Sequence, residues 1–202
     1  MGALRKHRPA EERRSDMVAA VIALAGERNP AEITTIAIAE RLQLTQGAVF
    51  RHFPTKDAIW QAVMEWVADT LLDRLTTAAA GVDSPLSAME AMFHRHLDFV
   101  AEYPGVPRIL FGELQRRESS PAKATTRLLL LRYAELLGTQ IRRGMTVGEI
   151  TTDTDPATAS MVFVGLIQGL VMQSLLAADP ALPKARAASV FACYRRGLER
   201  HA

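Results

Sequence analysis

Apolar side chains recur every three or four residues along most of the chain, which is the period of an amphipathic helix. Glycine, proline and short polar clusters interrupt the pattern at intervals. We expect nine helices: one from Pro9 to Gly26, two short ones within residues 33–53, and others over 57–77, 86–102, 108–115, 123–143, 157–178 and a last stretch ending near Arg200. No segment reads convincingly as a strand, so the pattern predicts an all-α protein.

Residues 33–60 predict two short helices joined by a tight turn. The apolar positions that would pack the two helices together are Ile36, Ala39 and Leu42 in the first, and Val49 and Phe53 in the second. A hydroxyl from Thr34 or Thr35 would cap the first helix and Thr45 would cap the second. Residues 43–44 remain for the turn. This is the pattern of a helix-turn-helix DNA-reading unit, although an ordinary helical hairpin has similar spacing.

The end of this unit carries a distinctive sequence, Phe-Arg-His-Phe-Pro-Thr-Lys-Asp, over residues 50–57. The region resembles the TetR/AcrR family of one-component transcriptional regulators, whose helices end in a pattern like G-[AT]-[LV]-Y-x-H-F-x-[ST]-K-[ED]. Two positions depart from it. Phe50 replaces the usual tyrosine and leaves an apolar contact for a thymine methyl group. Gln43 replaces the usual turn glycine, which predicts a left-handed backbone with a Cβ atom, at a cost of about 1 kcal/mol.

The resemblance implies a DNA-binding domain over residues 1–56 and a helical effector-binding and dimerisation domain over 57–202. Arg51 would contact guanine and Gln46 adenine, while other side chains would contact phosphates. The predicted DNA-binding residues are Thr35, Thr45, Gln46, Gly47, Phe50, Arg51, His52 and Lys56.

The net charge of +2 says little about nucleic-acid binding, but basic residues gather at the N-terminus. They are Arg5, Lys6, Arg8, Arg13 and Arg14. The first residues could form an arm that follows phosphates or enters the minor groove, and a solvated tail is an equal alternative.

Residues 157–178 are apolar over a length that approaches the roughly 20 residues of a membrane span. Polar residues within it, such as Gln168 and Gln173, favour instead a helix buried on nearly all sides, with glycines that let a partner helix come close. The resemblance favours a homodimer interface here, with Gly165, Gly169, Met172, Phe191 and Tyr194 as its residues. A dimer would read an inverted repeat with half-sites about 34–36 Å apart.

The middle helices hold more aromatic and methionine side chains than a bare scaffold needs. As a set they suggest a cavity for a small apolar or amphipathic effector, whereas ordinary core packing is the simpler reading of each alone. The predicted ligand-binding residues are Phe93, His96, Phe99, Tyr103, Arg108, Phe111, Tyr133 and Gln168. Met89, Met92, Met161, Gln115 and Arg132 are further candidates.

No enzymatic motif is present: the sequence lacks HExxH, CxxC, GxSxG and a GxGxxG after a strand. We therefore expect no catalytic residue, cofactor or metal site. The single cysteine, Cys193, has apolar neighbours and predicts a buried thiol, and its lack of a partner favours a reducing cytoplasm. Residues 1–9 show no secretory pattern.

Together these features predict a homodimeric repressor that a small ligand releases from its operator. Two alternatives stay open: a DNA-binding dimer without a small-molecule effector, and a helical protein-interaction module.

Overall fold

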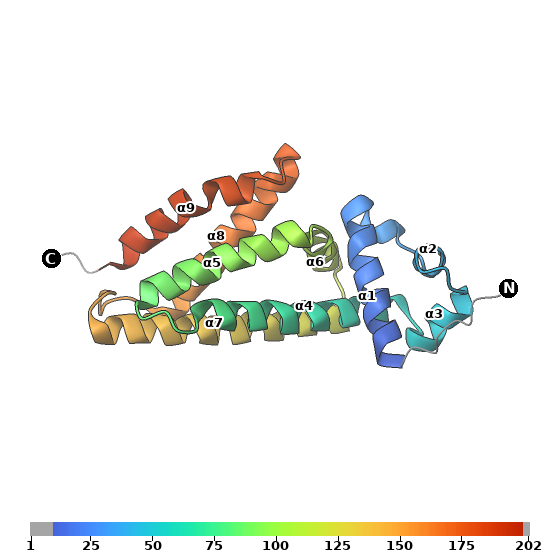
Figure 1. Cartoon of the computed structure of the whole chain (residues 1–202), viewed down its shortest axis with the longest axis horizontal. Helices are drawn as coiled ribbons and strands as arrows, with labels where there is room; N and C mark the ends of the chain where they lie inside the picture. The colour runs from blue at the N-terminus through green and yellow to red at the C-terminus, as the bar shows by residue number, and fades with distance from the viewer. Residues whose placement is uncertain (1–9, 200–202) are drawn as a thin grey trace. The chain divides into compact units, whose positions relative to one another are not determined.

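The computed structural model describes residues 10–199, and the predicted arm residues Arg5, Lys6 and Arg8 lie outside this range. The described residues form nine α-helices, one short 3₁₀ helix and no strand, as expected for an all-α protein (Figure 1). The elements are α1 (Ala10–Glu27), η1 (Pro30–Glu32), α2 (Thr35–Arg41), α3 (Gln46–His52), α4 (Lys56–Ala79), α5 (Pro85–Glu102), α6 (Gly105–Gln115), α7 (Pro121–Val147), α8 (Pro156–Ala177) and α9 (Leu182–Leu198).

The chain packs as two compact units. Among the described residues, the first contains residues 10–66 together with Tyr103–Thr125, and the second contains Val67–Glu102 and residues 126–199. Helix α4 therefore begins in the first unit and continues into the second. The predicted functional division at residue 56 was drawn from sequence and stays a prediction.

In the first unit α1 packs against α6 and α2, and α2 packs against α3. The close crossing of α1 and α6 depends on Gly105. A Cβ atom there would lie 2.0 Å from the Ile22 carbonyl oxygen and 2.8 Å from the Gly26 nitrogen, so only glycine fits. The sequence predicts an interruption after residue 102, with the next helix starting at Arg108. Instead α6 begins at Gly105 and accommodates Pro107 in its first turn, where proline is tolerated.

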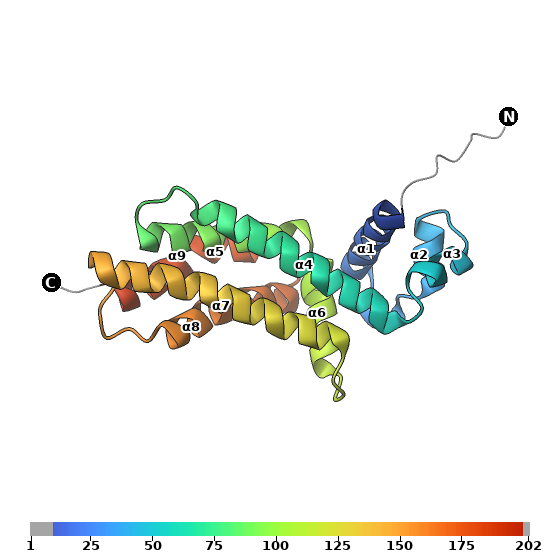
Figure 2. The same cartoon turned by 90° about the horizontal axis from the view of Figure 1, so that it is seen from below.

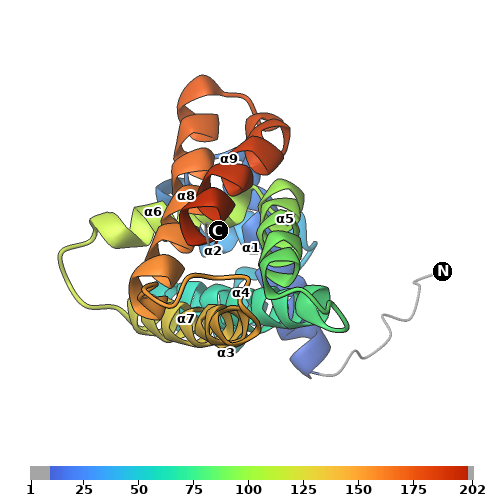
Figure 3. The same cartoon turned by 90° about the vertical axis from the view of Figure 1, so that its left-hand side faces the viewer.

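In the second unit α9 packs against both α5 and α8, an arrangement visible end-on in Figure 3. Helices α4 and α7 run side by side in the same direction (Figure 2). Aromatic rings form the centre of this core. Phe163 of α8 meets the ring of Phe93 at 5.4 Å and that of Tyr194 at 5.7 Å, both edge to face, a favoured geometry for aromatic pairs.

Helix α7 continues past Gly144, where the sequence predicted its end. A Cβ atom at Gly144 would lie 2.6 Å from Cδ1 of Ile150, so this glycine makes room for the chain that folds back over the helix. The Gly144 carbonyl oxygen accepts hydrogen bonds from the backbone nitrogens of Glu149 and Ile150, at 2.9 and 3.1 Å. The left-handed residue that ends the helix is Gly148, with φ 79°.

Helix α8 is apolar and long enough to cross a membrane by length and composition alone. The expectation that it is buried on nearly all sides is wrong for the protomer, because only a third of its most apolar window is buried. Its exposed large apolar residues are Met161, Val162, Met172, Leu175 and Leu176. The burial predicted for Cys193 is also wrong: the thiol is exposed on α9, while Phe191 and Tyr194 turn into the core.

Candidate DNA-binding surface and effector site

Two side-chain caps position the short helices of the candidate DNA-binding surface. The Thr34 hydroxyl accepts a hydrogen bond from the Ala37 nitrogen at 3.1 Å, and the Thr45 hydroxyl accepts one from the Ala48 nitrogen at 3.3 Å. Each satisfies a backbone donor that a helix start otherwise leaves free. The caps expected from the sequence are confirmed, with Thr34 rather than Thr35 on α2.

The turn between the helices is as tight as predicted. Gln43 has φ 54°, in the left-handed region, and the Leu44 nitrogen donates to the Ala39 carbonyl oxygen at 2.8 Å. The expectation of a non-glycine residue in this conformation is confirmed.

Packing of α2 on α3 differs from the prediction at one residue. Val49 and Phe53 are buried as expected, with 0% and 1% of their surface exposed, but Ile36 is 52% exposed. The inward face of α2 is formed by Ile38 and Ala39. Ile36 precedes Ile38 by two residues, or about 200° around the helix, and therefore points away from the core.

The structure joins two of the predicted DNA-binding residues. The Gln46 Nε2 donates to the Thr35 hydroxyl at 2.9 Å, so the first turns of α2 and α3 share a polar surface. Large apolar side chains flank this contact. Ile36 follows Thr35 in the chain, and Phe50, 45% exposed, lies one turn after Gln46. Helical spacing alone predicts that Ile36 faces inward, so the sequence does not identify it as a surface residue.

Arg14 contacts the C-terminal end of α3. Its guanidinium carbon lies 4.6 Å from the centre of the Phe53 ring, and Nη1 donates to the His52 carbonyl oxygen at 3.4 Å. A cation at a helix C-terminus offsets the partial negative charge of its carbonyl groups. Arg14, which the sequence placed in a basic N-terminal cluster, therefore belongs to α1 and positions α3. The Arg51 side chain, in the last turn of α3, is exposed.

Lys56, a predicted phosphate contact, is the first residue of α4. Its Nζ donates to the Ala31 carbonyl oxygen at 2.9 Å and lies 5.5 Å from the Trp60 ring centre. Partial burial lowers the pKa of this ammonium group. The next residue is also fixed: Asp57 accepts a hydrogen bond from Arg116 at 2.7 Å. Hydrogen bonds thus connect the start of α4 to η1 and to the residue that follows α6.

Several of the residues predicted to line an effector cavity are buried in the core of the second unit. Phe93, Phe99 and Tyr133 expose at most 1% of their surface. The His96 Nδ1 lies 3.2 Å from the Tyr133 hydroxyl oxygen, and burial lowers the pKa of His96 to about 4, so the ring is neutral at pH 7. These rings act as core side chains in the described structure.

The other predicted ligand residues do not all belong to one unit. Tyr103, Arg108 and Phe111 belong to the first unit, where the Tyr103 ring meets Trp66 edge to face at 4.9 Å. Arg108 and Gln168 are exposed. The other five predicted ligand residues belong to the second unit, and the assignment of all eight to one cavity stays a prediction.

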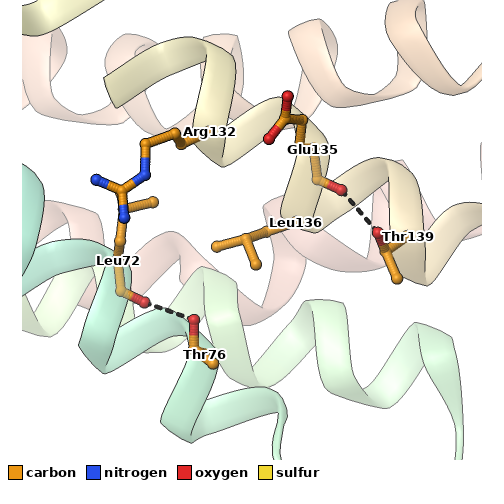
Figure 4. Close-up of a pocket in the computed structure, with 6 residues that line it drawn as sticks. All are labelled: Leu72, Thr76, Arg132, Glu135, Leu136 and Thr139. Atoms are coloured by element: carbon orange, nitrogen blue, oxygen red, sulfur yellow. Dashed lines mark hydrogen bonds between the residues drawn. The ribbon is translucent and has the colours of Figure 1, made fainter. Parts of the chain in front are cut away.

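A groove lies instead on the second unit, between α4 and α7 (Figure 4). It encloses about 340 Å³ and is open on one side. Its lining residues are Leu72 and Thr76 of α4, and Arg132, Glu135, Leu136 and Thr139 of α7. Of these residues, only Arg132 is a ligand-binding candidate in the sequence, because the others have no distinctive spacing.

The predicted dimer residues fall into two groups. Gly165 and Gly169 have open space where a Cβ would stand, and Met172 is 42% exposed, so these three lie on the exposed apolar face of α8. Phe191 and Tyr194 are 0% and 7% exposed. They are core residues of the protomer, and the expectation that they form an interface surface is wrong. Their large rings fill the space between α5, α8 and α9.

Comparisons with known proteins agree with this architecture. Residues 18–63 match the family described as "Bacterial regulatory proteins, tetR family", and residues 113–190 match "Tetracyclin repressor-like, C-terminal domain". The nucleoid occlusion factor SlmA of Marinobacter nauticus is 29% identical over 173 residues, which cover 81% of this chain and 86% of the relative.

Solved structures share the fold. FadR of Bacillus subtilis, determined in complex with stearoyl-CoA, superposes with a TM-score of 0.81 at 16% identity, covering 91% of this chain and 98% of that chain. NalD, the secondary repressor of the MexAB-OprM multidrug efflux pump in Pseudomonas aeruginosa, has a TM-score of 0.70 at 24% identity, covering 96% and 100%. At these identities the likeness shows the fold alone.

Proposed function

Because this chain belongs to the tetR family of bacterial regulatory proteins, we propose that it is a homodimeric repressor that binds an inverted-repeat operator. It is a DNA-binding regulator rather than an enzyme. The observation that carries the proposal is the capped pair α2 and α3, whose first turns share the hydrogen bond between Gln46 and Thr35. We place the protein in the cytoplasm, where an operator is accessible.

In this proposal Arg51 and Gln46 read base edges, and Phe50 contacts a thymine methyl group. Thr35, Thr45, His52 and Lys56 hold the phosphates, and Gly47 keeps the leading surface of α3 low. Ile36 adds an apolar contact, because its side chain is 52% exposed and it follows Thr35, the hydrogen-bond partner of Gln46, in the chain. The functional division at residue 56 follows, with the reader before it and the sensing and dimerising body after it.

The test of DNA reading is fluorescence anisotropy on duplexes from the region that flanks the gene, against random duplex, across a salt series. Arg51→Ala should weaken operator binding by about tenfold or more and relax base preference at one position. Arg127→Ala is the matched control, because it removes the same charge from an exposed position on α7. Equal loss in both variants, or equal binding of every duplex by the natural protein, would count against base reading.

Dimerisation is proposed to use the exposed apolar face of α8 as a contact between two copies. Gly165→Val should dissociate the dimer without unfolding the protomer, because the added side chain meets open space within one chain but blocks the approach of a second helix. Gly112→Val on α6, also in open space, is the control. Sedimentation equilibrium measures the mass of both, and an intact Gly165→Val dimer would place the interface elsewhere.

We propose that a small apolar or amphipathic molecule lowers operator affinity by binding one arrangement of the body better than another. The continuity of α4 through both units supports such coupling. A broad ligand panel, screened for shifts in melting temperature and operator affinity, tests it. The proposal fails if no compound changes either.

A second candidate is a DNA-binding dimer that has no small-molecule effector. The packing of Tyr133 against His96 and Phe163, and of Phe93 against Phe163, favours it, because these side chains are buried against one another. The Marinobacter nauticus relative is named for nucleoid occlusion. Mapping of bound chromosomal sites separates the two candidates: a few sites beside regulated genes support the ligand-released repressor, and sites spread along the chromosome support the second candidate.

A further inference from the structure

The groove between α4 and α7 combines an apolar floor with polar groups at defined places. The Leu136 side chain extends from α7 toward α4, and Leu72 lies across from it (Figure 4). At one end stands the Arg132 guanidinium, and toward the other stand the hydroxyl groups of Thr76 and Thr139. The volume of about 340 Å³ is within the range of small-molecule sites, roughly 300–1,000 Å³.

Arg132 is the residue that would favour a negatively charged ligand in this groove. Its Nη1 lies 3.9 Å from Asp69 Oδ1, beyond hydrogen-bond distance, and the Asp69 side chain is 81% exposed. This contact therefore leaves the guanidinium donors available, and their planar fork matches a carboxylate. Glu135, the other charged residue of the lining, turns its carboxylate away from the space between the helices (Figure 4).

Thr76 and Thr139 provide hydrogen-bond acceptors for the end of a ligand that lies away from Arg132. Thr76 Oγ1 donates to the Leu72 carbonyl oxygen at 2.8 Å, and Thr139 Oγ1 donates to the Glu135 carbonyl oxygen at 2.9 Å. Because each hydroxyl proton is used within its own helix, each oxygen presents lone pairs and acts as an acceptor. A ligand that reaches these oxygens needs a hydrogen-bond donor. Arg132 and Thr139 are seven residues apart, which is about 10 Å along the helix.

We propose that this groove binds a small hydroxy-carboxylate: a carboxylate on Arg132, an apolar chain over Leu72 and Leu136, and a hydroxyl that donates to Thr139. The inference rests on the proposed effector response and moves the effector site from the aromatic core to the groove. A buried acceptor lies nearby, since Gln140 Oε1 has no hydrogen-bond partner among the described residues and follows Leu136 by one helical turn.

The experiment is isothermal titration calorimetry of the full chain with 8-hydroxyoctanoate, whose length suits the span of about 10 Å. Octanoate lacks the donor and 1,8-octanediol lacks the carboxylate. We expect the hydroxy acid to bind most tightly of the three. Arg132→Gln should weaken it about tenfold or more, as for loss of a hydrogen bond to a charged group. Arg127→Gln, an exposed arginine on the same helix, should leave binding unchanged.

Thr139→Val supplies a second readout that a general loss of structure would not mimic. It should weaken 8-hydroxyoctanoate but leave octanoate unaffected, because only the former donates a hydrogen bond there. No heat from any probe at millimolar concentration, or equal binding by the natural chain and Arg132→Gln, overturns the inference. Operator binding is then measured with and without the hydroxy acid. Specific binding in the groove with unchanged operator affinity would support the site and count against the effector response, so the two failures are distinguishable.

Discussion

The DNA-reading helices and the helical body use different physics to hold their shape. Helices α2 and α3 have seven residues each, and hydroxyl caps from Thr34 and Thr45 fix their starts. Isolated helices this short are unstable in water, so such local contacts matter. The body relies on rings that bury one another, with Phe163 at the centre. Capping hydrogen bonds therefore fix the starts of the reading helices, whereas the body depends on contacts between rings that are far apart in the chain.

The largest effect should come from the ring at the centre of the body. Phe163→Ala removes a side chain with 0% exposure that contacts rings from α5, α7 and α9, and we expect it to lower the free energy of unfolding by about 4 kcal/mol. Leu131→Ala, at a site 59% exposed, should change it by less than about 0.5 kcal/mol. Urea unfolding measures both. A small effect of Phe163→Ala would mean that the cluster is loosely packed and could admit a ligand after all.

The contrast also explains what the sequence could and could not predict. Caps, the left-handed Gln43 and the burial of Val49 and Phe53 follow from residues close together in the chain, and the structure confirms them. The predicted burial of Ile36 is wrong because a seven-residue helix is too short for the spacing of its apolar residues to identify its inward face. In the body, the sequence identifies the aromatic residues as a group. It does not predict their contacts, because these contacts join helices that are far apart in the chain. Spacing along one helix cannot show whether such rings line a cavity or fill it.

The same limit applies to the glycines. Gly105 and Gly144 looked like helix ends in the sequence, because glycine often follows the last helical turn. Each instead permits a close approach, to α1 in one case and to Ile150 in the other. The α4–α7 groove had no sequence signal either, since its threonines and leucines become neighbours only when the two helices lie side by side.

His96 gives the body a dependence of stability on pH. Burial holds its pKa near 4, below the ordinary value of about 6.5, so the unfolded chain binds the proton first as the pH falls. Stability is then lost between about pH 6.5 and pH 4, and by pH 5 the loss from this group should reach about 2 kcal/mol. His96→Gln should remove that part of the acid sensitivity. Urea unfolding at pH 7 and pH 5 compares this variant with the natural chain, and equal acid sensitivity in the two would contradict the assignment.

The smallest effect belongs to the reader and tests whether its turn is strained. Gln43 adopts φ 54°, a conformation that a Cβ atom disfavours by about 1–2 kcal/mol, whereas glycine adopts it freely but loses more backbone entropy on folding. The two terms partly cancel, so Gln43→Gly should stabilise the chain by up to about 1 kcal/mol. Gln43→Ala keeps the Cβ atom and should give no such gain, which separates relief of strain from loss of the glutamine side chain. Operator affinity should change little, because the residue lies between the helices rather than on their reading surface. If Gln43→Gly were less stable than Gln43→Ala, contacts of the turn would outweigh its backbone strain, and the reader would depend on packing as the body does.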